Sequence, residues 1–253
     1  MIVNRNDYHM TGPDTGYGVG HQILTTASFD QSEIDLALLL LRLRQYHGGD
    51  GVFGIDCGAN IGAHTVEWAR AMTGWGEVLA FEAQERVFYA LAGNIAINNC
   101  LNASARHDAV GATCGTLNIP EPNYLVPSSF GSLELRQKEG NEFIGQKIDY
   151  SDARLKPVDM VSIDSFKLRR VDFIKIDVEG MEVEVLDGAV ATLARCRPVL
   201  LIEVIKSDRA ALESTLTSAG YSTMDLGLNL LALHRDDPLY ASVKVENGVI
   251  SIT

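Results

Sequence analysis

Short runs of mostly apolar residues alternate along much of the chain with longer segments of helical periodicity. The runs fall at residues 51–56, 78–82, 171–177 and 198–203, and the helical segments at residues 63–72, 85–99, 182–194 and 208–218. Because the runs lack a polar residue at every second position, we expect strands that are buried on both faces. Such strands, separated by helices, predict a doubly wound α/β fold with a mostly parallel sheet. Residues 221–225 and 229–234 predict an antiparallel hairpin at the end of this sheet.

The N-terminal region departs from this alternation. Residues 1–30 are polar and rich in glycine, and we expect an extended arm there. A helix is predicted to follow, beginning at Asp30 or Ser32 and ending at Gly48. The arm and its helix therefore occupy residues 1–48.

A second irregular region lies in the middle of the chain. Residues 111–157 contain prolines, glycines and an alternating stretch at residues 130–136. This composition favours an insertion with strand or hairpin content. Since no linker composition separates the regions, residues 1–253 are predicted to form a single domain.

Composition and charge argue against several classes of function. The chain is 46% hydrophobic and 21% charged, which is typical of a globular protein, and its net charge of −12 disfavours a nucleic-acid partner. No apolar run approaches the roughly 20 residues that a membrane span needs, and the N-terminus lacks the apolar stretch of a signal peptide. The four cysteines are scattered, without the spacing of a zinc site or a disulfide framework. We therefore expect a cytoplasmic protein.

A glycine-containing turn follows the first buried strand. Residues 55–65 read Ile-Asp-Cys-Gly-Ala-Asn-Ile-Gly-Ala-His-Thr and lead into a helix, which is where open α/β sheets bind nucleotides. Gly58 and Gly62 allow a tight turn and the close approach of a ligand, and Asp56 suits an ammonium group. The G-x-x-x-G spacing differs from the dinucleotide fingerprint G-x-G-x-x-G. A tight turn without a ligand is the structural alternative.

Acidic residues at the ends of the next two strands extend this candidate site. Glu82 ends the second strand, 20 residues after Gly62, where a carboxylate can accept hydrogen bonds from two ribose hydroxyls. Together with Asp56 and the glycine turn, it favours S-adenosylmethionine over a dinucleotide. Asp108 and Ala109 are predicted to end the third strand beside the adenine ring, where Asp108 accepts from the exocyclic amine. A solvent-exposed Asp108 is the alternative.

Three charged side chains gather at the fourth strand. Residues 173–182 read Phe-Ile-Lys-Ile-Asp-Val-Glu-Gly-Met-Glu, and alternation along a strand places Lys175 and Asp177 on one face. Glu179 follows just past the strand end. Because this strand is expected to lie across the switch point from the first, its tip should face the reactive end of the cofactor. The group could deprotonate an alcohol or hold a divalent cation, or it could be an ion pair with a capping Glu.

Taken together, these motifs resemble the FkbM-type methyltransferases. The resemblance rests on Asp56-Cys-Gly-Ala-Asn-Ile-Gly62, Phe81-Glu82-Ala, Asn94, Asn98, Ser162-Ile-Asp-Ser165, Lys175-Ile-Asp-Val-Glu-Gly180 and Arg197-Pro-Val-Leu-Leu-Ile-Glu203. It covers about residues 50–205. It implies a class I fold with a seven-stranded, Rossmann-like sheet that ends in an antiparallel hairpin. It also implies S-adenosylmethionine as cofactor and O-methylation of a hydroxyl on a sugar, a glycan or a small secondary metabolite.

The predicted site has two parts. Cofactor binding is assigned to Asp56, Gly58, Ala59, Asn60, Gly62, Thr65, Glu82, Asp108 and Ala109, and catalysis to Asp177, Glu179 and Lys175. No resident metal is assigned, although Mg²⁺ held by the acidic pair is an alternative to a carboxylate base. The alternative functions are a non-catalytic S-adenosylmethionine-binding module and an NAD-dependent oxidoreductase.

Overall fold

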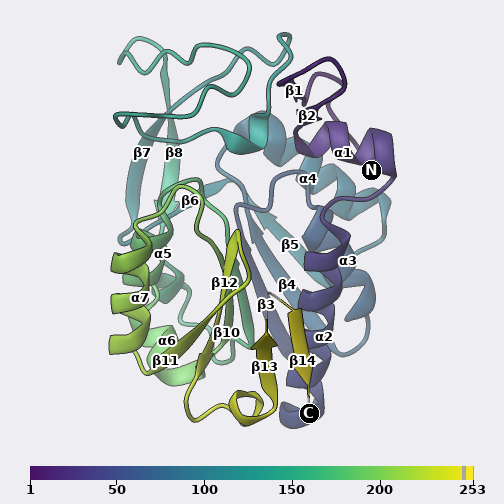
Figure 1. Ribbon diagram of the computed structural model, residues 1–253, viewed down its shortest axis with the longest axis vertical. Helices are drawn as coiled ribbons and strands as arrows, with labels where there is room; N and C mark the ends of the chain where they lie inside the picture. The colour runs from purple at the N-terminus through teal and green to yellow at the C-terminus, as the bar shows by residue number, and fades with distance from the viewer. Residues whose placement is uncertain (247–248, 253) are drawn as a thin grey trace.

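The computed structural model describes residues 1–246 and 249–252, and its centre is a seven-stranded sheet with the order β11-β12-β10-β9-β3-β4-β5 (Figure 1). The strands are β3 (Val52–Cys57), β4 (Gly76–Phe81), β5 (Ala103–Arg106), β9 (Phe173–Ile176), β10 (Val199–Glu203), β11 (Tyr221–Asp225) and β12 (Asn229–His234). Strands β10, β9, β3, β4 and β5 are mutually parallel, whereas β12 is antiparallel to β10 and β11. The predicted α/β fold with a large, mostly parallel sheet is confirmed.

Helices cover both faces of this sheet (Figure 1). One face packs against α2 (Gln31–Gly48), α3 (Ala63–Ala71) and α4 (Glu85–Ile97), and the other against α5 (Glu182–Asp187), α6 (Val190–Cys196) and α7 (Arg209–Ser218). Alternate residues of one strand enter opposite cores: Leu200 and Ile202 join one hydrophobic cluster, and Val199 and Leu201 join the other. This two-sided burial explains the mostly apolar runs.

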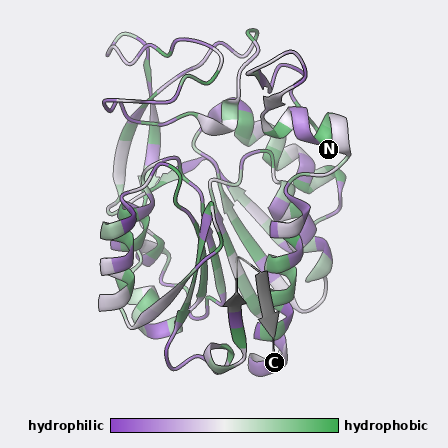
Figure 2. Cartoon of the chain, in the orientation of Figure 1, coloured by the Kyte–Doolittle hydropathy of each residue, from purple (hydrophilic) through white to green (hydrophobic). Residues whose placement is uncertain are grey.

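The hydrophobic residues concentrate between the layers. Figure 2 shows mostly hydrophobic strands in the central sheet and helices that carry both hydrophobic and hydrophilic residues. All four cysteines are free thiols. Within the described part of the chain, no helix combines the length and apolar character that crossing a bilayer requires.

The prediction of one helix over residues 182–194 is wrong, because this segment forms two separate helices, α5 and α6. Asp164 accepts hydrogen bonds from the backbone amides of Ala191 and Thr192, each at 2.8 Å, and so binds the first turn of α6. A Cβ on Gly188, between the helices, would lie 2.1 Å from the carbonyl oxygen of Gly111. Backbone packing at Gly188 and the hydrogen bonds from Asp164 therefore divide the segment.

The predicted insertion contributes to a second, three-stranded sheet with the order β6-β8-β7. Its strands are β6 (Asp108–Val110), β7 (Gly115–Pro120) and β8 (Leu155–Val161), and β7 and β8 form the expected antiparallel pair. The strand expected within residues 130–136 is wrong, because Phe130–Ser132 is the 3-10 helix η1. The alternation there reflects burial of Phe130, Leu133 and Leu135 in an irregular loop.

The N-terminal arm is folded rather than extended. It contains β1 (His9–Met10), β2 (Gly16–Tyr17) and α1 (Val19–Thr26). The Asp7 carboxylate, 3% exposed, accepts hydrogen bonds from the backbone amides of Gly20 at 2.9 Å and Phe130 at 3.0 Å. It thereby joins the arm to the long loop before β8. We call residues 1–30 and 121–154 the roof, because both segments lie at one end of the molecule (Figure 1) and contribute to the same cavity.

The remaining elements are peripheral to the site. They are η2 (Ile163–Phe166), η3 (Pro238–Ala241) and an antiparallel pair formed by β13 (Val243–Glu246) and β14 (Val249–Ile252).

Replacing Asp7→Ala should destabilise the roof. The substitution leaves the amides of Gly20 and Phe130 without their acceptor, and a buried donor without a partner costs about 1–3 kcal/mol. Urea denaturation should report the lower free energy of unfolding, and limited proteolysis should cut residues 1–30 faster. The exposed Asp14→Ala provides the control, with an expected change within about 0.5 kcal/mol. Equal stability of Asp7→Ala and wild type would contradict this role of Asp7.

Candidate active site

The turn between β3 and α3 brings two loops into direct contact. Gly58 and Gly62 have φ angles of +80° and +88°, which favour glycine. A Cβ on Gly58 would lie 1.7 Å from the carbonyl oxygen of Asp177, so no larger residue fits without movement of the backbone. The amide of Asp177 also donates to the carbonyl of Cys57 at 3.0 Å. The crevice thus lies between β3 and β9, where the strand order reverses and ligands commonly bind.

Asp56 presents an unsatisfied carboxylate oxygen in this crevice. The residue is 1% exposed and lines the central cavity. Its Oδ2 accepts from the hydroxyl of Thr65 at 2.6 Å, whereas its Oδ1 has no hydrogen-bond partner among the described residues. Burial raises the pKa of Asp56, against the opposing effect of neighbouring Lys175. Because an unpartnered buried acceptor is costly, Oδ1 suits a donor from a ligand.

Glu82 follows β4 directly and lies on the same cavity. Its two oxygens accept from the backbone amides of Asn60 at 3.0 Å and Gln84 at 2.8 Å. Burial raises the pKa of Glu82 to about 7, although the two amide hydrogen bonds oppose this shift. Since each carboxylate oxygen has a second acceptor site, Glu82 can bind two further donors.

The placement of Asp108 and Ala109 differs from the prediction. The third strand of the main sheet, β5, ends at Arg106, and Asp108 begins β6 of the second sheet, paired with Asp159. The chain passes from one sheet to the other at His107 without a glycine or proline. The sequence pattern therefore does not mark the end of β5. Arg106 forms an ion pair with Asp108. Both predicted residues nevertheless line the cavity.

Some of the other residues of the predicted glycine motif line the cavity, and the rest support the residues that line it. Ala59 and Asn60 line the cavity. Thr65 is fully buried and holds the Asp56 carboxylate. A Cβ on Gly62 would lie 2.8 Å from the side chain of Leu91, so this glycine allows the turn to pack against α4.

Lys175 supplies a positive charge beneath the crevice. It is 5% exposed, and its ammonium lies 2.7 Å from Asp177 Oδ2 and 4.0 Å from Glu33 Oε1. In the parallel register it also lies beside Asp56. Burial alone would lower the pKa of Lys175, but Asp177, Glu33 and Asp56 together raise it. The side chain therefore remains charged, and the predicted Lys–Asp ion pair is present.

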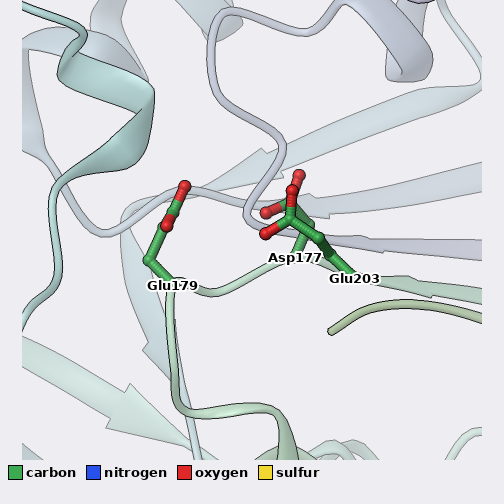
Figure 3. A group of neighbouring side chains, drawn as sticks. All are labelled: Asp177, Glu179 and Glu203. Carbon is green, nitrogen blue, oxygen red and sulfur yellow. The ribbon is translucent and has the colours of Figure 1, made fainter. Parts of the chain in front are cut away.

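Three carboxylates converge at the strand ends beside Lys175. Asp177, Glu179 and Glu203 each offer an oxygen within 4.8 Å of the others, and Figure 3 shows Asp177 and Glu203 close together with Glu179 facing them. Burial, followed by the charge of Asp177, raises the pKa of Glu179 to about 8 and that of Glu203 to about 9. Such a group can take up a proton near neutral pH or hold a divalent cation.

These side chains surround one cavity of about 340 Å³. That volume lies within the range of small-molecule sites. The strand ends form its floor, and the roof contributes Tyr17, Val19, Ser129 and Ser132 among others. A ligand in the cavity would therefore contact the main sheet and both roof segments.

Two cavity residues, Glu33 and His64, lie outside the set that the sequence assigned to the site. Glu33 of α2 lies 3.4 Å from Nε2 of His64 and accepts from the Asn229 amide at 2.9 Å. Burial lowers the pKa of His64, and neither ring nitrogen has a hydrogen-bond partner among the described residues. An acidic residue in a first helical turn is common, so only the contact of Glu33 with Lys175 identifies it as part of the site.

Comparison with known proteins identifies the family. Residues 56–223 match the profile of the Methyltransferase FkbM domain. Methyltransferase sdnD from Sordaria araneosa is 32% identical over 155 residues, which cover 54% of this chain and 60% of that protein. The match thus spans about three fifths of that relative's length.

A solved structure shares the fold. The FkbM methyltransferase from Methylobacillus flagellatus KT aligns with a TM-score of 0.52 and 18% identity, covering 73% of this chain and 44% of that one. The profile match itself extends from Asp56 to residue 223, well over half of the chain. The chain therefore belongs to the FkbM methyltransferase family.

Proposed function

We propose that this chain is an S-adenosylmethionine-dependent O-methyltransferase that acts on a hydroxyl of a sugar, a glycan or a small secondary metabolite. The observation that carries the proposal is one cavity that holds both the unpartnered oxygen of Asp56 and the carboxylates of Asp177 and Glu179. The first group suits a cofactor ammonium, and the second suits removal of a proton.

The cavity residues fit the cofactor at separate points. Asp56 Oδ1 would accept a hydrogen bond from the methionyl ammonium. The free acceptor sites on Glu82 would bind the two ribose hydroxyls. Asp108 and the backbone of Ala109 would contact the adenine. These residues come from the ends of neighbouring strands, which is the usual origin of nucleotide sites in this fold class.

When bound, S-adenosylmethionine supplies a methyl group on a positively charged sulfur, which is a good leaving group. Alignment of the acceptor with this methyl group accounts for much of the rate. An aliphatic hydroxyl is a poor nucleophile near neutral pH, so its proton must be removed as it attacks. We assign this step to Asp177 and Glu179. Lys175 orients Asp177 at 2.7 Å, and the raised pKa of Glu179 makes it a stronger base.

A bound cation is the alternative within the same site. Asp177, Glu179 and Glu203 would hold Mg²⁺ through carboxylate oxygens, which this ion prefers. The ion would polarise the acceptor hydroxyl in place of a free carboxylate base. We favour the carboxylate base because Lys175 already lies against Asp177 and Lys206 lies 2.6 Å from Glu179.

The variant Glu82→Gln should bind S-adenosylmethionine less tightly and with a weaker dependence on pH. Losing hydrogen bonds to a charged acceptor costs about 1.5–3 kcal/mol, a tenfold to hundredfold increase in Kd at pH 8. In the wild type, protonation of Glu82 below its pKa of about 7 removes the charged acceptor. Affinity should therefore fall about tenfold from pH 8 to pH 6.

Isothermal titration at both pH values measures these changes. Glu85→Gln is the matched control, because Glu85 is an exposed carboxylate at the start of α4 and does not line the cavity. Its Kd should equal that of the wild type. If Glu82→Gln bound the cofactor normally, the ribose-binding role would be wrong.

The variant Asp177→Asn should lose turnover while retaining the cofactor. The substitution removes the carboxylate to which we assign proton transfer, so kcat should fall about a hundredfold or more. The Kd of S-adenosylmethionine should stay within about threefold. A methyl-transfer assay over sugars, glycans and small alcohols, combined with titration, measures both values, and the exposed Asp187→Asn is the control.

The outcomes separate the mechanisms. Near-normal kcat in Asp177→Asn would move the catalytic group elsewhere. Loss of wild-type activity in EDTA, restored by Mg²⁺, would favour the cation over the free carboxylate base. A wild-type protein that binds the cofactor but methylates nothing in the panel would favour a non-catalytic binding module.

A further inference from the structure

The side chain of Lys206 joins the roof to residues 177–180, the turn after β9 that carries the proposed base Glu179 and that we call the catalytic turn. Lys206 lies between β10 and α7, and its side chain is 11% exposed. The ammonium donates to the carbonyl oxygen of Ser132 at 2.7 Å. It also lies 2.7 Å from Glu142 Oε2 and 2.6 Å from Glu179 Oε2. Ser132 and Glu142 belong to the roof, whereas Glu179 belongs to the predicted base.

Three protein oxygens surround the Lys206 ammonium, one as a hydrogen-bond acceptor and two as ion-pair partners. A lysine ammonium has three N–H donors, and three protein oxygens lie within 2.7 Å of Lys206 Nζ. Burial would lower the pKa of Lys206, but Glu179 and Glu142 raise it, so the side chain stays charged. Lys206 is therefore placed to fix its neighbours rather than to touch the acceptor.

The contacts continue from Glu142 into the N-terminal arm. The hydroxyl of Tyr17 donates to Glu142 Oε1 at 2.7 Å and lies 2.9 Å from Nδ1 of His9. Burial would raise the pKa of Glu142, but hydrogen bonds from Lys206 and Tyr17 lower it, which favours the carboxylate. A continuous chain of polar contacts thus connects Tyr17, Glu142, Lys206 and Glu179.

The backbone of the catalytic turn is in an unfavourable conformation at Glu179. Glu179 has φ of +56°, in the left-handed region that is unfavourable for a residue with a Cβ. Gly180 follows at φ of +94°, and a Cβ there would lie 3.3 Å from the carbonyl oxygen of Lys206. The side chain of Lys206 therefore contacts Glu179, and the backbone of Lys206 lies against Gly180.

We propose that Lys206 is a positioning residue that fixes Glu179 and makes its placement depend on closure of the roof. Glu179 is in place when Tyr17 and Glu142 lie over the cavity, so proton removal is coupled to enclosure of the acceptor. The catalytic part of this inference rests on the proposed function of Glu179.

The first test compares Lys206→Met and Lys206→Arg with the wild type in the full chain. In Lys206→Met, kcat should fall about tenfold to hundredfold, the loss expected for charged hydrogen bonds. The Kd of S-adenosylmethionine should change less than about threefold, because Asp56 and Glu82 make no contact with Lys206. Lys206→Arg keeps the charge and should recover part of kcat. The exposed Lys147→Met, on the roof segment that carries Glu142, should match the wild type.

A double-mutant cycle tests the coupling. Tyr17→Phe removes the hydroxyl contact and should raise the acceptor KM more than it lowers kcat. If the chain of contacts acts as a unit, Lys206→Met combined with Tyr17→Phe should be no worse than Lys206→Met alone. Additive losses in the double variant would overturn the coupling to the roof.

Hydrogen exchange provides a readout that needs no turnover. In Lys206→Met, amides near Tyr17 and Glu179 should exchange faster, while those of β3 and β4 should not change. If Lys206→Met does not fold, Glu142→Gln tests the same series of contacts. Its amide oxygen can still accept from the Tyr17 hydroxyl, but the negative charge that faces Lys206 is removed. Normal kcat and exchange in the folded variant would overturn the proposal. If the wild type showed no methyl transfer, the proposed function would be refuted. The hydrogen-exchange rates near Tyr17 and Glu179 would still show whether Lys206 links the roof to the catalytic turn.

Discussion

The buried ammonium of Lys175 allows several carboxylates to share one end of the sheet. It lies 2.7 Å from Asp177 and 4.0 Å from Glu33, and beside Asp56 in the strand register. Carboxylates gathered away from water repel one another and lose hydration. Without this cation, the crevice between β3 and β9 would hold uncompensated negative charge. With it, the site remains acidic enough to attract a positively charged ligand but does not require every carboxylate to be protonated.

The charge arrangement depends in turn on backbone geometry. The missing Cβ of Gly58 lets the loops after β3 and β9 touch, and this contact sets the separation between Asp56 and Asp177. The roof encloses the crevice partly through Asp7 and Lys206, which both bind η1: Asp7 accepts from the Phe130 amide, and Lys206 donates to the Ser132 carbonyl. The strand ends thus form a floor under a cover that is held by polar contacts and by apolar packing, such as that of Val19 against Ile61 and Val87.

The sequence predicts the floor much better than the cover. Strands buried on both faces have a clear pattern, and residues at their ends, such as Glu82 and Asp177, can be placed from it. The roles of Glu33 and Lys206 cannot be predicted this way, because each depends on a partner far away in the chain. The folding of the arm likewise depends on hydrogen bonds from Gly20 and Phe130 to Asp7, and local composition does not encode such contacts.

The two halves of the cavity differ in how they are encoded. The residues proposed to bind the cofactor lie in one continuous stretch, from Asp56 to Ala109, whereas the rest of the cavity combines Tyr17, residues 129–135 and the strand ends near Glu203. A substitution in one of these separate segments would alter the shape of the cavity there and leave the proposed cofactor contacts intact. If those proposed contacts hold, this division gives descendants of one ancestral gene a physical route to new acceptors while the methyl-donor site is preserved.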